Sequence, residues 1–139
     1  MIKLRIITPE KIVYEGEIKQ ATLPVSNGEV TILPNHRSYI ASLKPGEIVV
    51  KNDKSEETDL AVSGGFVEFH NNELVVLADE AERAEDIDLK KAEEAKKRAE
   101  ELKKQKYTDE NEYARVVANL EKELAWTRVA KRYLKRKGL

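Results

Sequence analysis

The side chains that most often perform catalysis or bind metals are scarce in this 139-residue sequence. It contains no cysteine and only two histidines, His36 and His70, which are far apart along the chain. No His-x-x-x-His or Glu-x-x-His spacing accompanies them, so neither a metal site nor a nucleophilic triad is predicted. The simplest interpretation of His36, which follows Pro34-Asn35, is a loop histidine that hydrogen-bonds locally. We therefore expect no catalytic residue, no metal and no required cofactor.

Phosphate-binding loops are also missing from the sequence. There is no Gly-x-x-x-x-Gly-Lys-Ser/Thr and no Gly-x-Gly-x-x-Gly pattern, so any nucleotide site would be built from scattered side chains. The lack of cysteine and of a signal-like start favours a reducing, cytosolic setting. No apolar run approaches the roughly 20 residues that a spanning helix requires, so we expect a soluble or peripheral protein.

Charge is distributed unevenly along the chain. Residues 1–84 carry a net charge of −5 and residues 85–139 a net charge of +4. Only Glu123 opposes the basic residues from Lys122 onward, which are Lys122, Arg128, Lys131, Arg132, Lys135, Arg136 and Lys137. A helix end with this charge is expected to bind an acidic partner.

The elements that position these charges change type between Ala81 and Ala92. All four prolines and five of the six glycines precede this stretch, and no helix breaker follows it until Gly138. Asp86 and Asp88 occupy positions suited to an N-cap and a first-turn acid, because a carboxylate accepts hydrogen bonds from the free N–H groups at a helix start. We predict an α+β protein with one domain at 1–84 and a second at 85–139.

The first domain has the spacing of an all-β fold, with short segments rich in Ile, Val, Leu and Thr that each end in a turn signal. The predicted strands are Lys3–Ile7, Ile12–Tyr14, Glu17–Pro24, Glu29–Ile32, Ser38–Leu43, Gly46–Lys51, Glu57–Ser63, Gly65–His70 and Glu73–Ala78. Asn27-Gly28 and Asn71-Asn72 indicate hairpin turns. Gly64-Gly65 permits a tight turn or a close backbone approach, and the apolar Glu73–Ala78 run suits a buried strand. Antiparallel strands of this number bury their edges in a sandwich or flattened barrel.

The second domain is predicted to be two antiparallel helices. Leu89, Ala92, Ala95, Ala99 and Leu102 share one face of the first helix, which ends near Gln105–Tyr107. Since this stripe is mostly alanine, its burial removes little apolar surface from water, and we expect weak packing and a detachable helix.

The second helix begins after Asp109, with Glu112 placed for a capping box, and carries two apolar faces. The main stripe comprises Tyr113, Val116, Val117, Leu120, Leu124 and Leu134. Trp126, Ala130 and Tyr133 lie about 100° around the helix. This second face either packs on the sandwich or binds another protein, and a coiled-coil dimer is a third alternative although neither helix sustains the necessary heptads.

Three stretches resemble the epsilon subunit of bacterial F-type ATP synthase. Val25–His36 is similar to the family's Gly-Glu-x-x-Ile-x-Pro-Gly-His, with Asn35 where the family has glycine. The others are Ala61–Glu68, with sequence Ala-Val-Ser-Gly-Gly-Phe-Val-Glu, and Ala81–Asp88. The resemblance covers essentially the whole chain and implies the same sandwich and helical hairpin.

The resemblance also implies a noncatalytic role in a rotary enzyme at the cytoplasmic face of the bacterial membrane. The sandwich would bind the gamma subunit and the ring of c subunits of a proton- or sodium-driven rotor, with Glu29 and His36 as contacts. The hairpin would extend into the alpha/beta head and block ATP hydrolysis. Its inhibitory contacts with an acidic beta-subunit segment would be made by Lys122, Arg128, Lys131, Arg132, Lys135 and Arg136.

Some members of this family bind ATP as a regulatory ligand through a motif resembling Ile/Leu-Asp-x-x-Arg-Ala. Here the motif is Ile87-Asp88-Leu89-Lys90-Lys91-Ala92, with lysine in place of the arginine. An ammonium binds phosphate less selectively than the planar guanidinium fork. The residues that the resemblance places at nucleotide contacts are Glu82, Ile87, Asp88, Lys91, Ala92, Arg98, Arg128 and Arg132. The alternative is a capping acid with ordinary solvated bases.

We expect repulsion among Lys91, Arg98, Arg128 and Arg132 to favour opening of the hairpin unless an anion such as ATP lies between them. A stand-alone ATP-sensing module would use the same residues without binding gamma or the ring. A nucleic-acid-binding module is suggested only by the basic helix end, since the chain lacks a recognisable reader fold and is close to neutral overall. We therefore expect no nucleic-acid partner and only indirect membrane association.

Overall fold

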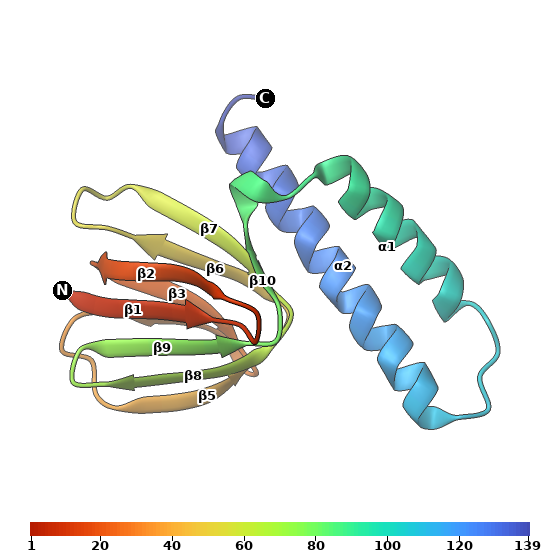
Figure 1. The fold of residues 1–139 in the computed structure, drawn as a ribbon, viewed down its shortest axis with the longest axis horizontal. Coiled ribbons are helices and arrows are strands. Elements are labelled where there is room, and N and C mark those ends of the chain that lie inside the picture. The colour runs from red at the N-terminus through yellow and green to blue at the C-terminus, as the bar shows by residue number, and fades with distance from the viewer.

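The computed structural model describes all residues, 1–139, as a β-sandwich from which a two-helix hairpin projects (Figure 1). The strands are β1 (Ile2–Ile7), β2 (Ile12–Ile18), β3 (Gln20–Val25), β4 (Gly28–Ile32), β5 (Tyr39–Leu43), β6 (Gly46–Lys51), β7 (Glu57–Val62), β8 (Gly65–His70), β9 (Glu73–Ala78) and β10 (Ala81–Arg83). A short 3-10 helix, η1 (Ala84–Asp86), leads to α1 (Leu89–Lys103) and α2 (Glu110–Arg136). The predicted α+β class is confirmed. Neither helix combines the length and apolar composition needed to span a membrane.

The strands form two layers that join on one side and are bridged by a side chain on the other. One layer has the order β10-β7-β6-β3-β4 and the other β5-β8-β9-β1-β2, and only the pair Val25–Leu43 links β3 to β5. On the opposite side, Nε and Nη2 of Arg83 both donate to the Val13 carbonyl oxygen at 3.3 Å. The guanidinium also lies over the Tyr14 ring. Arg83 therefore holds β10 against β2 and nearly closes the barrel.

The sandwich has a core of its own. Its 18 buried side chains all come from residues 2–78, and strand alternation places them there, as in β1, where Ile2, Leu4 and Ile6 point inward. The expectation of a buried strand at Glu73–Ala78 is only half right, because β9 has one outward face and Leu77 is 53% exposed.

The strands differ from the prediction in three places. β1 and β9 pair in parallel, which the long connection between them permits, whereas every other pair is antiparallel. β2 continues to Ile18 instead of ending at Tyr14. β10 lies in the stretch that was expected only to lead into the helix.

Residues with positive φ occur at all three predicted turns. Asn71 and Asn72 have φ of 50° and 60° and form the predicted two-residue hairpin turn. In the other hairpin the turn residues are Ser26 and Asn27, and Gly28, with φ of 126°, opens β4. Gly65 lies at the turn and also allows the backbone of β9 to approach closely. A Cβ atom at position 65 would lie 2.0 Å from the Leu77 carbonyl oxygen.

The helices begin at the predicted caps. The Asp88 carboxylate accepts the Lys91 backbone N–H at 3.2 Å, and that of Asp109 accepts the Asn111 N–H at 2.8 Å. Asp86 belongs to η1 instead of the first helical turn, and α1 ends at Lys103, slightly before the predicted end.

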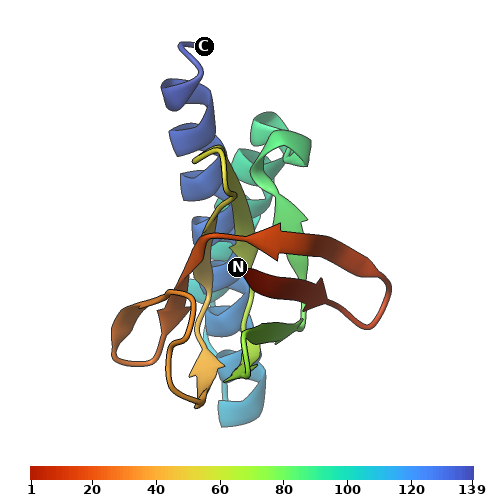
Figure 2. The same ribbon diagram turned by 90° about the vertical axis from the view of Figure 1, so that its left-hand side faces the viewer.

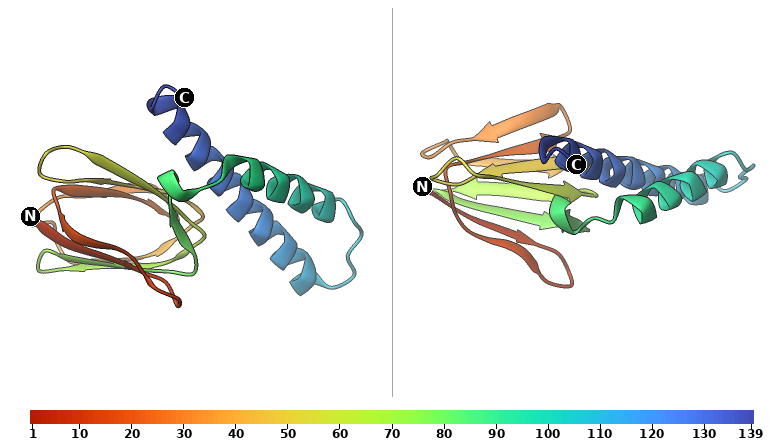
Figure 3. Two further views of the ribbon diagram at one scale, coloured as in Figure 1. Left: turned by 45° about the horizontal axis from the view of Figure 1, so that its top comes forward. Right: turned by 90° about the horizontal axis from the view of Figure 1, so that it is seen from above.

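The hairpin contacts the sandwich mainly through α2, which lies against the outer side of β6 and β7 while α1 packs on α2 (Figure 3). Trp126, Val129 and Ala130 are buried, so the second face of α2 is covered within this chain. The predicted main stripe is partly wrong, because Tyr113 and Leu124 are exposed.

Candidate functional site

The outer surface of β6, β7 and β10 carries acidic side chains around one small apolar residue. Strand register places Ala61 directly between Glu47 of β6 and Glu82 of β10. We call the surface formed by Glu47, Glu57, Asp59, Glu80, Ala61 and Glu82 the acidic face. It is the part of the sandwich on which α2 docks.

Hydrogen bonds and ion pairs connect α2 to the acidic face along its C-terminal half. The Trp126 indole N–H donates to Glu82 at 2.9 Å, and the Lys122 ammonium lies 2.6 Å from a Glu80 oxygen. Further along the helix, Arg132 donates to Glu47 at 2.5 Å. Arg136, beyond it, contacts Glu57 at 3.1 Å and also donates to Asp59. The basic end of α2 thus has acidic partners inside its own chain.

The apolar part of this contact is small. Its buried members are Ala61, Ala84, Ala92, Ala125, Trp126 and Val129. Four of the six are alanines, which remove little surface from water, so Trp126 supplies most of the apolar burial. The docked position of the hairpin therefore depends strongly on the polar contacts.

Glu47 shows that these polar contacts are not uniformly favourable. Burial raises the pKa of the Glu47 carboxyl above its ordinary value, and this outweighs the opposing attraction of Arg132. The Glu47 side chain is only 10% exposed whereas that of Arg132 is 67% exposed, so solvent screens the cation more than the anion. Glu47 Oε2 and Asp59 Oδ1 are moreover buried without a hydrogen-bond partner. Removing these carboxylates from water offsets part of the Coulomb gain.

The residues predicted to inhibit the catalytic head are mostly paired in this conformation. Lys122, Arg132 and Arg136 bind the acidic face, and Lys131 lies 3.4 Å from Glu93 of α1. Arg128 and Lys135 are exposed and make no ion pair. Contact of this set with another subunit stays a prediction, and it requires α2 to leave the acidic face.

The structure divides the predicted nucleotide residues between those with contacts inside the chain and those that are exposed without a partner. Glu82 accepts the Trp126 indole, Asp88 caps α1 and Ala92 is buried beneath α2, with Ile87 half-buried beside it. Lys91, Arg98 and Arg128 are exposed without ion-pair partners, whereas Arg132 is bound to Glu47. The expectation that uncompensated repulsion involves Arg132 is therefore wrong, because Glu47 already neutralises it.

The two predicted rotor contacts lie at opposite ends of β4. Glu29 is exposed beside the turn at Ser26–Asn27, where the residue opposite it is Pro24. His36 follows the other end of β4, and its ring packs edge-on against Tyr39 and Phe69 with centroids 6.0 and 5.9 Å away. No single end of the sandwich presents both residues.

A second surface, which the sequence reasoning missed, covers the outer side of β5, β8, β9, β1 and β2. Its register aligns Phe66, Leu77, Ile7 and Ile12 in a row across four strands. We call these four residues the apolar row; Phe66 is 65% exposed and Ile40 of β5, nearby, is 75% exposed. The outward Phe66 within the alternating strand Gly65–His70 was the available signal.

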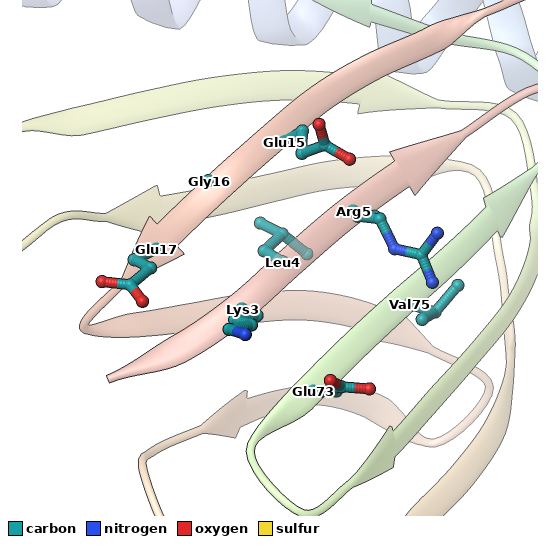
Figure 4. Close-up of a pocket in the computed structure, with 8 residues that line it drawn as sticks. All are labelled: Lys3, Leu4, Arg5, Glu15, Gly16, Glu17, Glu73 and Val75. Atoms are coloured by element: carbon teal, nitrogen blue, oxygen red, sulfur yellow. The ribbon is translucent and has the colours of Figure 1, made fainter.

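An open groove lies on the same surface, beside the apolar row (Figure 4). Across the strands, Lys3 lies between Glu17 and Glu73, and Arg5 lies beside Glu15. Its lining residues are Lys3, Leu4, Arg5, Glu15, Gly16, Glu17, Glu73 and Val75. Alternating charges around an exposed apolar row are typical of the polar rim of a protein interface.

Known proteins match the chain in sequence over both parts. Residues 1–84 match the family described as ATP synthase, Delta/Epsilon chain, beta-sandwich domain, and residues 85–131 match the long alpha-helix domain of the same chain. An ATP synthase epsilon chain of Dehalococcoides mccartyi is 41% identical over 131 residues, which cover 94% of this chain and 93% of that one. The Clostridium novyi epsilon chain is 48% identical over 99 residues, covering 71% and 76%.

Solved structures share the fold at lower identity. A chain of the Euglena gracilis mitochondrial ATP synthase OSCP/F1/c-ring assembly matches with a TM-score of 0.77 and 21% identity, covering 89% of this chain and 78% of that chain. One from the Tetrahymena thermophila mitochondrial ATP synthase central stalk and c-ring has a TM-score of 0.66 and 14% identity, covering 93% and 96%. Since the family match spans the sandwich and most of the helices, the chain belongs to the ATP synthase delta/epsilon chain family.

Proposed function

We propose that this chain is a noncatalytic subunit of the central rotor stalk of an F-type ATP synthase, in which the sandwich provides assembly and the hairpin regulates ATP hydrolysis. The observation that carries the proposal is the separation of two surfaces. The apolar row is exposed on one layer of the sandwich, and the acidic face binds α2 on the other. One surface can remain bound to a partner while the other releases the hairpin.

The apolar row supports the assembly role. Phe66 and Leu77 are large, exposed and adjacent across β8 and β9, and contiguous exposed apolar residues with a charged rim mark protein-binding surfaces. We assign this surface to the gamma subunit. Glu29 and His36, at opposite ends of β4, suit contacts with two different partners, gamma and the c ring. The chain would then associate with the cytoplasmic face of the membrane only through this complex.

The contacts of α2 support the regulatory role. Release would expose a small apolar cluster and return Glu47, Asp59 and Glu82 to water, so the free energies of the two states are expected to be close. A released α2 would present Lys122, Arg132 and Arg136 as an uncompensated basic surface. Such a surface fits an acidic segment of the catalytic head, where the hairpin would block hydrolysis.

ATP is proposed as a ligand that favours the docked hairpin. Lys91, Arg98 and Arg128 are exposed cations on the two packed helices, and a triphosphate could bind between them. A ligand shifts the docked population only by its differential affinity for the two states. ATP would act on this chain only as a regulatory ligand and not as a substrate.

The division of labour is tested with two variants reconstituted with purified gamma subunit and c ring. Residues 1–84 alone should bind the stalk as the full chain does, because their core is complete without the helices, but should not inhibit ATP hydrolysis. Phe66→Glu in the full chain should weaken stalk binding at least about tenfold, because it places a charge in the apolar row. Circular dichroism checks the fold of both variants. Loss of gamma binding by residues 1–84, or tight binding by Phe66→Glu, would contradict the assignment.

ATP binding is tested with a fluorophore pair on the sandwich and α2 of the isolated chain. ATP should move the pair toward the docked distance more effectively than ADP. Lys91→Arg should tighten ATP binding about tenfold, because the planar guanidinium adds a charge-assisted hydrogen bond. If the distance does not change at millimolar ATP in either protein, ATP is not a direct ligand.

The pH dependence of docking isolates Glu47. Its pKa is raised above 4.5 in the docked state, so a proton binds this state more tightly than the released state, in which the carboxyl is solvated. The stabilisation of the docked state by protonated Glu47 is therefore fully present below pH 4.5. It is lost as the pH rises through the pKa that Glu47 has in the docked state. Glu47→Gln, which mimics the protonated carboxyl, should therefore dock more tightly than the parent protein at neutral pH, and the two should converge in acid.

Acrylamide quenching of Trp126, the only tryptophan and a buried docking residue, measures this difference. Glu68→Gln, on the exposed outer side of β8, is the matched control and should follow the parent at every pH. Greater quenching in Glu47→Gln at neutral pH would show that the ion pair with Arg132 outweighs the burial of Glu47.

A further inference from the structure

Two turns lie against each other at the end of the sandwich away from the hairpin (Figure 2). Leu33-Pro34-Asn35-His36 is closed by the His36 N–H bonding to the Leu33 carbonyl oxygen at 3.1 Å. Asn35 has φ of 66°, so Pro34 and Asn35 fit the central positions of a type II turn, where glycine is favoured at the second. The second turn is Asn71-Asn72, between β8 and β9.

Asn72 holds the two turns together with both ends of its side-chain amide. Its Oδ1 accepts the Asn35 backbone N–H at 2.6 Å, and its Nδ2 donates to Asn35 Oδ1 at 3.0 Å. The backbone N–H can only donate, which fixes the orientation of the Asn72 amide. The Asn72 backbone carbonyl oxygen also accepts a hydrogen bond from the Lys3 N–H at 2.9 Å, so the same residue contacts β1.

These bonds explain how asparagine is tolerated at position 35. A side chain other than glycine in the left-handed region has a conformational cost, and local hydrogen bonds are what make asparagine acceptable there. The two hydrogen bonds with Asn72 offset this cost. Asn72 also has a left-handed backbone, with φ of 60°, because it is part of the hairpin turn between β8 and β9.

Asn35, one member of this pair, lies directly before His36 in the same loop. Next to Asn35, the His36 ring is held edge-on by Tyr39 and Phe69, and its Nδ1 lies 2.7 Å from the Arg37 carbonyl oxygen. Because that carbonyl can only accept, Nδ1 carries a hydrogen, and Nε2 makes no hydrogen bond within the chain. Behind the loop, Ser38 Oγ and His70 Nδ1 are 2.8 Å apart and add a second link to β8.

We infer that Asn72 is the positioning residue for the His36 loop, because its two hydrogen bonds to Asn35 hold residues 33–37 in the conformation in which the proposed stalk contact is made. This inference rests on the proposed stalk function. A loop that is already held in its bound conformation loses less conformational entropy on binding than a mobile one. Asn72 acts through the loop and need not contact the partner.

The test compares Asn72→Gly with Asn71→Gly in the full chain. Glycine accepts the left-handed backbone at both positions, so the hairpin turn is kept, but only Asn72→Gly removes the two bonds to Asn35. In Asn72→Gly, amide hydrogen exchange at Asn35 should accelerate about tenfold, as expected for the loss of a hydrogen bond. Affinity for the purified gamma subunit and c ring should fall roughly three- to thirtyfold through lost preorganisation. Asn71→Gly should change neither quantity.

Equal exchange at Asn35 in the two variants would overturn the inference, because the side-chain amide would then not hold the loop. Faster exchange with unchanged stalk affinity would overturn the positioning role. His36→Ala separates that second result from failure of the proposed function. If His36→Ala weakens stalk binding, only the role of Asn72 is wrong; if it does not, this end of the sandwich is not the stalk contact.

Discussion

Neutralisation of the carboxylates on the acidic face determines where the hairpin lies. Asp59 is only 5% exposed, and Glu47 and Glu82 are covered by the same helix. A carboxylate removed from water requires a cation or a hydrogen-bond donor, and α2 supplies Arg136, Arg132 and the Trp126 indole at matching positions. Because the desolvation of these groups offsets only part of their attraction, the pairs determine the position of the helix and also contribute a modest net stabilisation of the docked state.

The sandwich and the hairpin consequently have different requirements for stability. The sandwich encloses its own core and is closed by Arg83, which belongs to its last strand. The hairpin depends on contact between α1 and α2 and on a mixed polar surface outside that core. Release of the hairpin would therefore leave the sandwich folded and its opposite, apolar-row surface unchanged. This combination suits a subunit that must stay assembled while one of its elements changes position.

Local signals in the sequence predicted most of the elements. Alternating apolar residues placed the strands, Asp88 and Asp109 marked the helix starts, and Asn71-Asn72 marked a hairpin, because each signal depends on residues a few positions apart. The parallel pairing of β1 with β9 and the hydrogen bond from Arg83 to Val13 were not predictable in this way. Both join segments that are distant in sequence, and their partners are specified only by the complete topology.

The candidate sites were likewise missed where they depend on residues distant in sequence. The basic run in α2 was expected to bind an acidic partner protein, and that contact stays a prediction; the sequence did not indicate that Glu47 and Asp59 of the same chain pair with it. These two acids become neighbours through the pairing of β6 and β7. The apolar row likewise appears only when Phe66, Leu77, Ile7 and Ile12 are aligned by strand register. Side chains assigned from the family resemblance were partly engaged in other contacts, as with Arg132.

The salt dependence of hairpin docking tests the central claim most directly. Added salt shortens the Debye length from about 10 Å at 0.1 M to about 3 Å at 1 M and weakens exposed ion pairs. If the acidic face positions α2, acrylamide quenching of Trp126 should increase over this range, while circular dichroism of the β-strands stays constant. Quenching that is unchanged or reduced at high salt would show that apolar packing holds the hairpin, and would contradict the electrostatic account of docking.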